Sequence, residues 1–186
     1  MGKETVSIYW DLEKFYDSIN WEYLVRWALE LDFDPSLLLI GLSMHTADRV
    51  VRVGPFVGQA GTVRGSVIAG CGLAVKWSKI MLYHSLHHTH YQVSRSLTDS
   101  FYDDMVTRAS GSFSLVLTAL ADAATYLAKL LAGAGLKVSA DKTTITTSNP
   151  RLTGLLQTEL NKRDIHLKVG RTCPDLGVDS GSGARR

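Results

Sequence analysis

The chain lacks several features that would assign it to a class at once. It has only two cysteines in 186 residues, Cys71 and Cys173, which do not suggest a disulfide framework and favour a reducing compartment. Its formal net charge is only +2, so charge alone does not indicate a nucleic-acid partner. No apolar run approaches the roughly 18 residues that span a membrane, and no signal peptide is visible. We expect an intracellular protein with no membrane partner.

The remaining sequence pattern predicts an α+β fold. An apolar share of 45% is ordinary for a globular protein, and the length suits one domain or a large piece of one. Hydrophobic periodicity predicts a mainly antiparallel sheet with helices packed on one face. The predicted helices are Trp21–Leu31, Pro35–Thr46, Leu73–His88, Ser112–Ala132 and Asn149–Arg163. The predicted strands and hairpins are Val6–Trp10, Arg49–Val63, Tyr91–Ala109, Lys137–Ser139, Thr143–Thr147, Ile165–Val169 and Leu176–Val178.

Two adjacent carboxylates, Asp103 and Asp104, stand between the β-prone runs Leu97–Tyr102 and Met105–Arg108. This arrangement predicts a tight hairpin with both acids at its tip, where a plain hairpin would use Asn-Gly or Asp-Gly. Two like charges this close cost free energy unless a cation compensates them. The pair therefore predicts a divalent metal site.

A third carboxylate, Asp11, ends the run Val6–Trp10, whose nearly all-apolar sequence predicts a central strand buried on both faces. Together with Asp103 and Asp104 it forms a candidate three-carboxylate cluster. Magnesium prefers oxygen ligands, typically one or two carboxylates with substrate phosphates. Two such ions about 3.5–4 Å apart support phosphoryl transfer, which is the chemistry that these acids predict.

Five ordered motifs resemble those of the reverse-transcriptase palm, the RNA-directed DNA polymerase domain of non-LTR retrotransposons and group II intron-like retroelements. Residues 11–19 resemble the first palm motif, and Phe101–Asp104 resembles the aromatic-x-Asp-Asp motif. The glycine-containing nucleotide motif, the Gly-Leu-x5-Lys-Thr motif and the Leu-Gly primer grip are matched at 64–71, 135–143 and 175–178. The resemblance implies a palm over residues 1–179, with fingers and thumb largely missing. The Gly/Ser-rich residues 180–186 are expected to be a disordered tail.

The resemblance also implies a reaction and its catalytic groups. Deoxynucleotides would be added to a primer 3′-hydroxyl with two Mg²⁺ ions, for which Mn²⁺ can substitute. Asp11, Asp103 and Asp104 would be catalytic metal ligands, and the Leu12 carbonyl would complete the shell of one ion. Lys142 would protonate or neutralise the departing pyrophosphate.

Substrate contacts follow from the same resemblance. Nucleotide binding would involve Leu12, Tyr16 and Gly70, with the ring of Tyr16 excluding a 2′-hydroxyl. Nucleic acid would contact Arg64, Leu176 and Gly177. The implied partners are an RNA template, a DNA primer, deoxynucleoside triphosphates and the fingers and thumb segments of a longer polyprotein. A eukaryotic element would place the protein in the nucleus or cytoplasm.

Plainer readings stand beside these roles. Tyr16 can be a core aromatic beside Phe15, Lys142 an exposed turn lysine, and Arg64 a solvated charge at a strand end. Many family members carry Pro-Gln where this chain has Ile68-Ala69, and alanine cannot replace the hydrogen bonds of that Gln. One alternative is therefore a catalytically inactive palm remnant that binds RNA or a protein partner. Another is an RNA-dependent RNA polymerase, which Tyr16 argues against.

Overall fold

The structure is a computed structural model that describes residues 3–61, 65–170, 172–175 and 178–181. The chain divides into two compact units. One comprises residues 1–13 together with 82–186, and the other comprises residues 14–81. The first unit contains the sheet that carries the predicted acids, so it is taken first.

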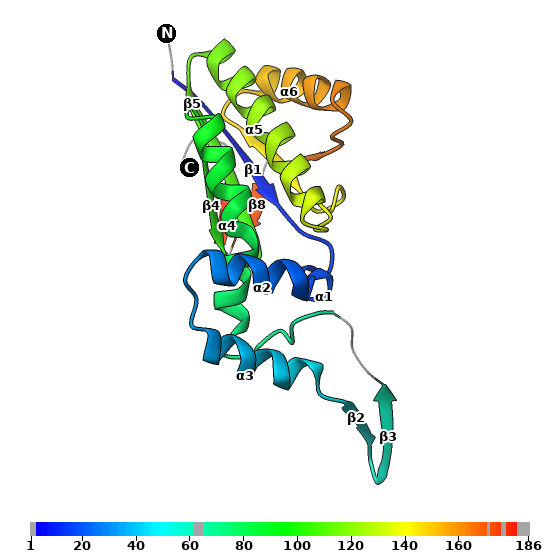
Figure 1. The fold of residues 1–186 in the computed structure, drawn as a ribbon. Coiled ribbons are helices and arrows are strands. Elements are labelled where there is room, and N and C mark those ends of the chain that lie inside the picture. The colour runs from blue at the N-terminus through cyan, green and yellow to red at the C-terminus, as the bar shows by residue number, and fades with distance from the viewer. Residues whose placement is uncertain (1–2, 62–64, 171, 176–177, 182–186) are drawn as a thin grey trace. The chain divides into compact units, whose positions relative to one another are not determined.

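The first unit is built on a five-stranded sheet in the order β4-β5-β1-β6-β7 (Figure 1). Its pairings are antiparallel except that between β6 and β7, so the sheet is mixed. The apolar strand β1 lies in the centre, as predicted, with Ser7, Ile8 and Trp10 among its buried residues. The strands are β1 Glu4–Trp10, β4 Leu97–Phe101, β5 Asp104–Gly111, β6 Thr144–Thr147 and β7 Lys168–Val169.

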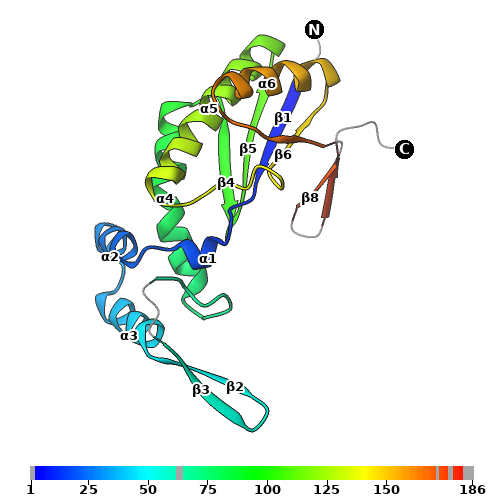
Figure 2. The ribbon, with the colours of Figure 1, turned by 90° about the vertical axis from the view of Figure 1, so that its right-hand side faces the viewer.

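Two helices, α5 Phe113–Gly133 and α6 Pro150–Lys162, cover one face of this sheet (Figure 2). Helix α5 contacts β5 and β1, and α6 contacts β6 and α5. By length and composition alone α5 could cross a membrane, with a mean hydropathy of 1.5. Its Leu120, Leu127 and Leu131 are buried, as expected of a core helix that packs on a sheet.

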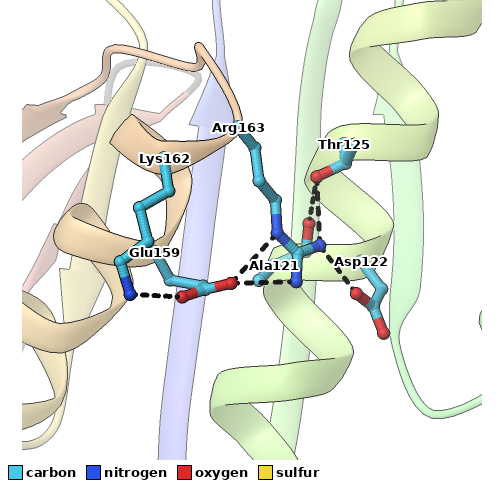
Figure 3. A network of polar contacts seen from close by, with 6 residues as sticks. All are labelled: Ala121, Asp122, Thr125, Glu159, Lys162 and Arg163. Carbon is cyan, nitrogen blue, oxygen red and sulfur yellow. Dashed lines mark hydrogen bonds and ion pairs between the residues drawn. The ribbon is translucent and has the colours of Figure 1, made fainter.

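Charged side chains fasten α6 to α5 (Figure 3). Arg163, which follows α6, donates to Asp122 Oδ1 at 2.7 Å and to Thr125 Oγ1 at 3.3 Å on α5. The same guanidinium donates to Glu159 Oε1 at 3.1 and 3.2 Å. The hydrogen bond to Asp122 is the main reason why the pKa of Arg163 is raised, and the hydrogen bond from Arg163 lowers the pKa of Glu159.

The second unit consists of short helices and a separate hairpin. Asn20 and Asp34 cap α2 and α3, because each side chain accepts hydrogen bonds from two backbone amides of the first turn. The elements are α1 Phe15–Ser18, α2 Trp21–Glu30, α3 Pro35–Thr46, β2 Arg49–Val53 and β3 Phe56–Gly61. Helix α4, Ala74–Gln92, begins in this unit and continues into the first.

Several strands and their bounds differ from the sequence-based expectations. The predicted strand Lys137–Ser139 is only an isolated bridge between Leu12 and Val138. The acid hairpin begins at Leu97 rather than Tyr91, because α4 continues to Gln92. Ser180 and Gly181 of the expected tail belong to β9, Val178–Gly181, which pairs with β8, Thr172–Asp175.

Candidate functional site

The sheet brings two of the predicted acids to adjacent strands. β1 and β5 pair so that Trp10 lies opposite Met105. Asp11 directly follows Trp10 in the chain, and Asp104 directly precedes Met105 as the first residue of β5. Asp103 is the neighbour of Asp104 in the turn before β5. All three carboxylates thus belong to one end of the central strand pair.

The acid hairpin has a two-residue turn, Tyr102–Asp103, between Phe101 and Asp104. Its tip is therefore Tyr-Asp, and Asp104 is already the first residue of β5, which differs from the predicted Asp-Asp tip. Tyr102 adopts a φ of +57°, in the left-handed region that disfavours a bulky side chain. Such strain concentrates at functional sites, where surrounding structure holds it in place.

One carboxylate oxygen of Asp11 is buried without a hydrogen bond. This oxygen is Oδ1, and the side chain as a whole is 36% exposed. The nearest described cation is the ammonium of Lys142, with Nζ 3.7 Å from Oδ1. That distance exceeds a hydrogen bond, so the pair gives Coulomb attraction but leaves the oxygen's lone pairs open. The structure thus brings together two residues that the motifs had assigned to catalysis.

The backbone of Asp11 is held by the chain that precedes β6. Its amide donates to Thr143 Oγ1 at 3.1 Å, and its carbonyl accepts from the Ser139 amide at 2.8 Å. Sequence reasoning did not assign a role to Thr143, which is fully buried. Thr143 ends the Gly-Leu-x5-Lys-Thr motif, but the motif does not reveal its contact with Asp11, which lies 132 residues away in the chain.

Leu12 is oriented by the bridge to Val138. The flanking hydrogen bonds run from Glu13 N to Lys137 O and from Ser139 N to Asp11 O, both at 2.8 Å. In this pattern the carbonyl of the central residue points away from the bridged strand. The Leu12 carbonyl is therefore not used in the bridge to Val138.

Tyr16 and Gly70 belong to the second unit. The Tyr16 carbonyl accepts from the Val67 amide at 2.7 Å, so the first motif and the nucleotide motif are joined there. Phe15 is buried against Tyr16, whose side chain is partly exposed. Gly70 has a φ of +88°, which favours glycine, and no neighbour lies within 4 Å of a built Cβ. Its glycine thus serves backbone conformation rather than tight packing.

The remaining predictions concern three nucleic-acid contacts, a metal-ligand group and a substrate cleft. Arg64, Leu176 and Gly177 lie outside the described residues. Within the described ranges, no group of three or more His, Cys, Asp or Glu side chains is arranged to hold a metal ion. Two clefts of about 580 and 400 Å³ are not lined by any of the predicted site residues.

No protein-family model matches the chain, and no curated protein is similar to it.

Proposed function

We propose that the chain is a reverse-transcriptase palm from a retroelement that adds deoxynucleotides to a primer 3′-hydroxyl on an RNA template. The proposal rests on the resemblance of the five ordered motifs. The observation that carries it is the buried Oδ1 of Asp11, which accepts no hydrogen bond, has only the more distant ammonium of Lys142 as a charge partner, and lies at the end of the central strand. A buried carboxylate oxygen without a partner is costly, and a bound cation would remove that cost.

The donor set fits magnesium. Asp11 and Asp103 would hold two ions, with Asp104 contributing less directly and the Leu12 carbonyl adding a backbone oxygen. Magnesium is usually held by one or two carboxylates plus substrate phosphates, so a ready-made three-ligand group is not required. Bound Mg²⁺ supplies Lewis acidity, which polarises phosphoryl oxygens and makes a hydroxyl a better nucleophile.

The remaining residues would position the substrates. Lys142 stands beside Asp11 on an exposed turn, from which its ammonium can neutralise or protonate a pyrophosphate. Tyr16 would close the sugar pocket to a 2′-hydroxyl. The left-handed backbone at Gly70 would leave room for a base or nucleotide.

Primer extension tests this proposal directly. We expect the chain, joined to the fingers and thumb segments that the resemblance implies, to incorporate deoxynucleotides into a DNA primer on an RNA template only when Mg²⁺ or Mn²⁺ is present. The chain alone should extend the primer poorly. Asp103→Asn should abolish incorporation, because it removes a ligand charge while preserving side-chain shape. Asp99→Asn on β4 is the matched control, since this exposed aspartate pairs with Arg108 and has no role in the proposal.

The second candidate is an inactive palm remnant that binds RNA or a protein partner. Ala69 in place of the family's Gln favours it, as does the lack of a three-ligand group among the described residues. RNA binding that persists without extension, and that neither divalent ions nor Asp103→Asn changes, would support this candidate and contradict the polymerase.

A further inference from the structure

One buried side chain controls Asp11 through its backbone, and the proposed mechanism does not use it. The Thr143 hydroxyl accepts from the Asp11 amide at 3.1 Å and donates to the Asp11 carbonyl at 3.4 Å. A hydroxyl carries one proton and two lone pairs, so it can make both bonds at once. Thr143 is 0% exposed, so water does not compete for this hydroxyl.

The threonine stands where the backbone ladder stops. The pairing of β1 with β6 ends at Tyr9 and Thr144. Beyond that point residues 140–142 leave the sheet in a turn, which the Thr143 amide closes by donating to the Ser139 carbonyl at 2.9 Å. The Thr143 hydroxyl therefore accepts the hydrogen bond of the Asp11 amide, which has no main-chain acceptor there, and adds a second donor to the Asp11 carbonyl beside the Ser139 amide.

The turn is attached to Asp11 at both of its ends. Thr143 holds one end, and the Ser139 amide, which donates to the Asp11 carbonyl at 2.8 Å, holds the other. Lys142 lies on this turn, with its ammonium 3.7 Å from the Asp11 carboxylate. The direction in which the carboxylate leaves β1 and the position of the lysine are thus set by the same contacts.

We propose that Thr143 is a positioning residue for the carboxylate of Asp11, whose hydroxyl fixes the carboxylate in the orientation that binds a divalent cation. This inference rests on the proposed function, because it takes Asp11 as a metal ligand. Groups that orient a ligand without touching the metal typically contribute about 10- to 100-fold in affinity. Thr143 acts on the ligand's backbone, so we expect an effect near the lower end of this range.

The test measures Mn²⁺ binding to the full chain. Binding is monitored by the loss of the paramagnetic resonance signal of free Mn²⁺. Thr143→Val removes the hydroxyl and keeps the shape, and should weaken binding about 10-fold. Thr143→Ser restores the hydroxyl and should bind about as tightly as wild type. Thr89→Val is the matched control, because Thr89 is also fully buried and its hydroxyl bonds only within α4, to the Ser85 carbonyl.

The outcomes separate this inference from the function on which it rests. Wild-type binding that Asp11→Asn weakens but Thr143→Val does not would overturn the positioning role and leave the metal site intact. Wild-type protein that binds no Mn²⁺, or binds it independently of Asp11, would overturn the metal site and the inference with it. Equal weakening by Thr143→Val and Thr89→Val would show a general loss of stability and would also overturn the role.

A measurement on the wild-type chain tests the contact even if a variant does not fold. Amide hydrogen exchange in the wild-type chain should be slow at Asp11, because its amide donates to a buried hydroxyl. Exchange at Asp11 as fast as at an exposed loop amide would contradict the contact itself. Thr143→Ala, which adds no methyl group to the site, repeats the binding test should the valine variant be unfolded.

Discussion

The two hairpins β2–β3 and β4–β5 look alike in sequence but are supported very differently. Both are β-prone runs around a two-residue turn. The main contacts of β2 and β3 are with each other, and Val53, Phe56 and Val57 are mostly exposed. In β5, by contrast, Met105, Thr107 and Ala109 are buried, because this strand also pairs with β1. An isolated two-stranded hairpin is at best marginally stable in water.

The backbone strain of the two turns runs against this difference in support. The β2–β3 turn uses Gly54 at a φ of +61°, where glycine pays little for a left-handed conformation. The β4–β5 turn forces Tyr102 into a φ of +57°. The well-supported hairpin therefore carries the strained turn, and it is also the one that bears the acids. Strain is tolerated where the rest of the sheet holds the strands in register.

Truncating a side chain should reveal the largest difference in stability between the two hairpins. Met105→Ala removes a buried side chain from β5 and should cost about 2–5 kcal/mol of unfolding free energy, measured by urea denaturation. Phe56→Ala on β3 should change it by less than about 0.5 kcal/mol, because that ring is exposed. Similar losses for the two variants would mean that β2–β3 packs as firmly as β4–β5.

Turn substitutions should give smaller effects of opposite sign. Tyr102→Gly relieves the left-handed conformation and should stabilise the chain by about 1 kcal/mol. Gly54→Ala should destabilise it by about 1 kcal/mol, since the only obstacle there is backbone strain and no atom lies within 4 Å of the new Cβ. Urea midpoints of the two variants check both signs, and a destabilised Tyr102→Gly would show that the contact of Tyr102 with Phe101 outweighs the strain.

Lowering the pH should reduce the stability of the unit that contains β4–β5. We expect this to be the smallest of the predicted effects on stability. Hydrogen bonds, chiefly from Arg163, lower the pKa of Glu159, and those from Asn149 and Ser148 lower the pKa of Glu4. The unfolded chain binds these protons at a higher pH than the folded chain. The stability they contribute is therefore present above their ordinary pKa of 4.5 and is lost as the pH falls through the lowered values.

Urea midpoints measured at about pH 6 and pH 3 test this dependence. The wild type should lose more stability on acidification than a variant with Glu4→Gln and Glu159→Gln. Equal losses would assign the acid sensitivity to other groups.

The sequence predicted best the features whose causes are local. Asn149 was identified as the start of a helix, and its side chain accepts a hydrogen bond from the first-turn amide of Arg151. The hairpin at 49–61 follows from its valines and Gly54. The bridge at Val138 was mistaken for a strand, because its single partner, Leu12, lies far away in the chain.

The candidate site follows the same rule. Asp11, Asp103 and Asp104 are visible as acids beside strands, so their places next to the ends of β1 and β5 could be predicted. The predicted three-carboxylate metal cluster is not found among the described residues. The strained φ of Tyr102 and the hydrogen bond between Thr143 and Asp11 could not be predicted, because both depend on how distant strands pair. The contact between Lys142 and Asp11 was not predicted, since the family resemblance only assigned both residues to one reaction.

The central place of β1 has a consequence for how the chain is made. A ribosome releases β1 long before the strands that flank it, since Trp10 bonds to a residue 97 positions later and Asp11 to one 132 positions later. During that interval an apolar strand has both edges unpaired, which exposes it to wrong partners on other nascent chains. Contacts this distant also slow folding. We therefore expect production of the protein in cells to depend on chaperones that shield β1 until β5 and β6 have emerged.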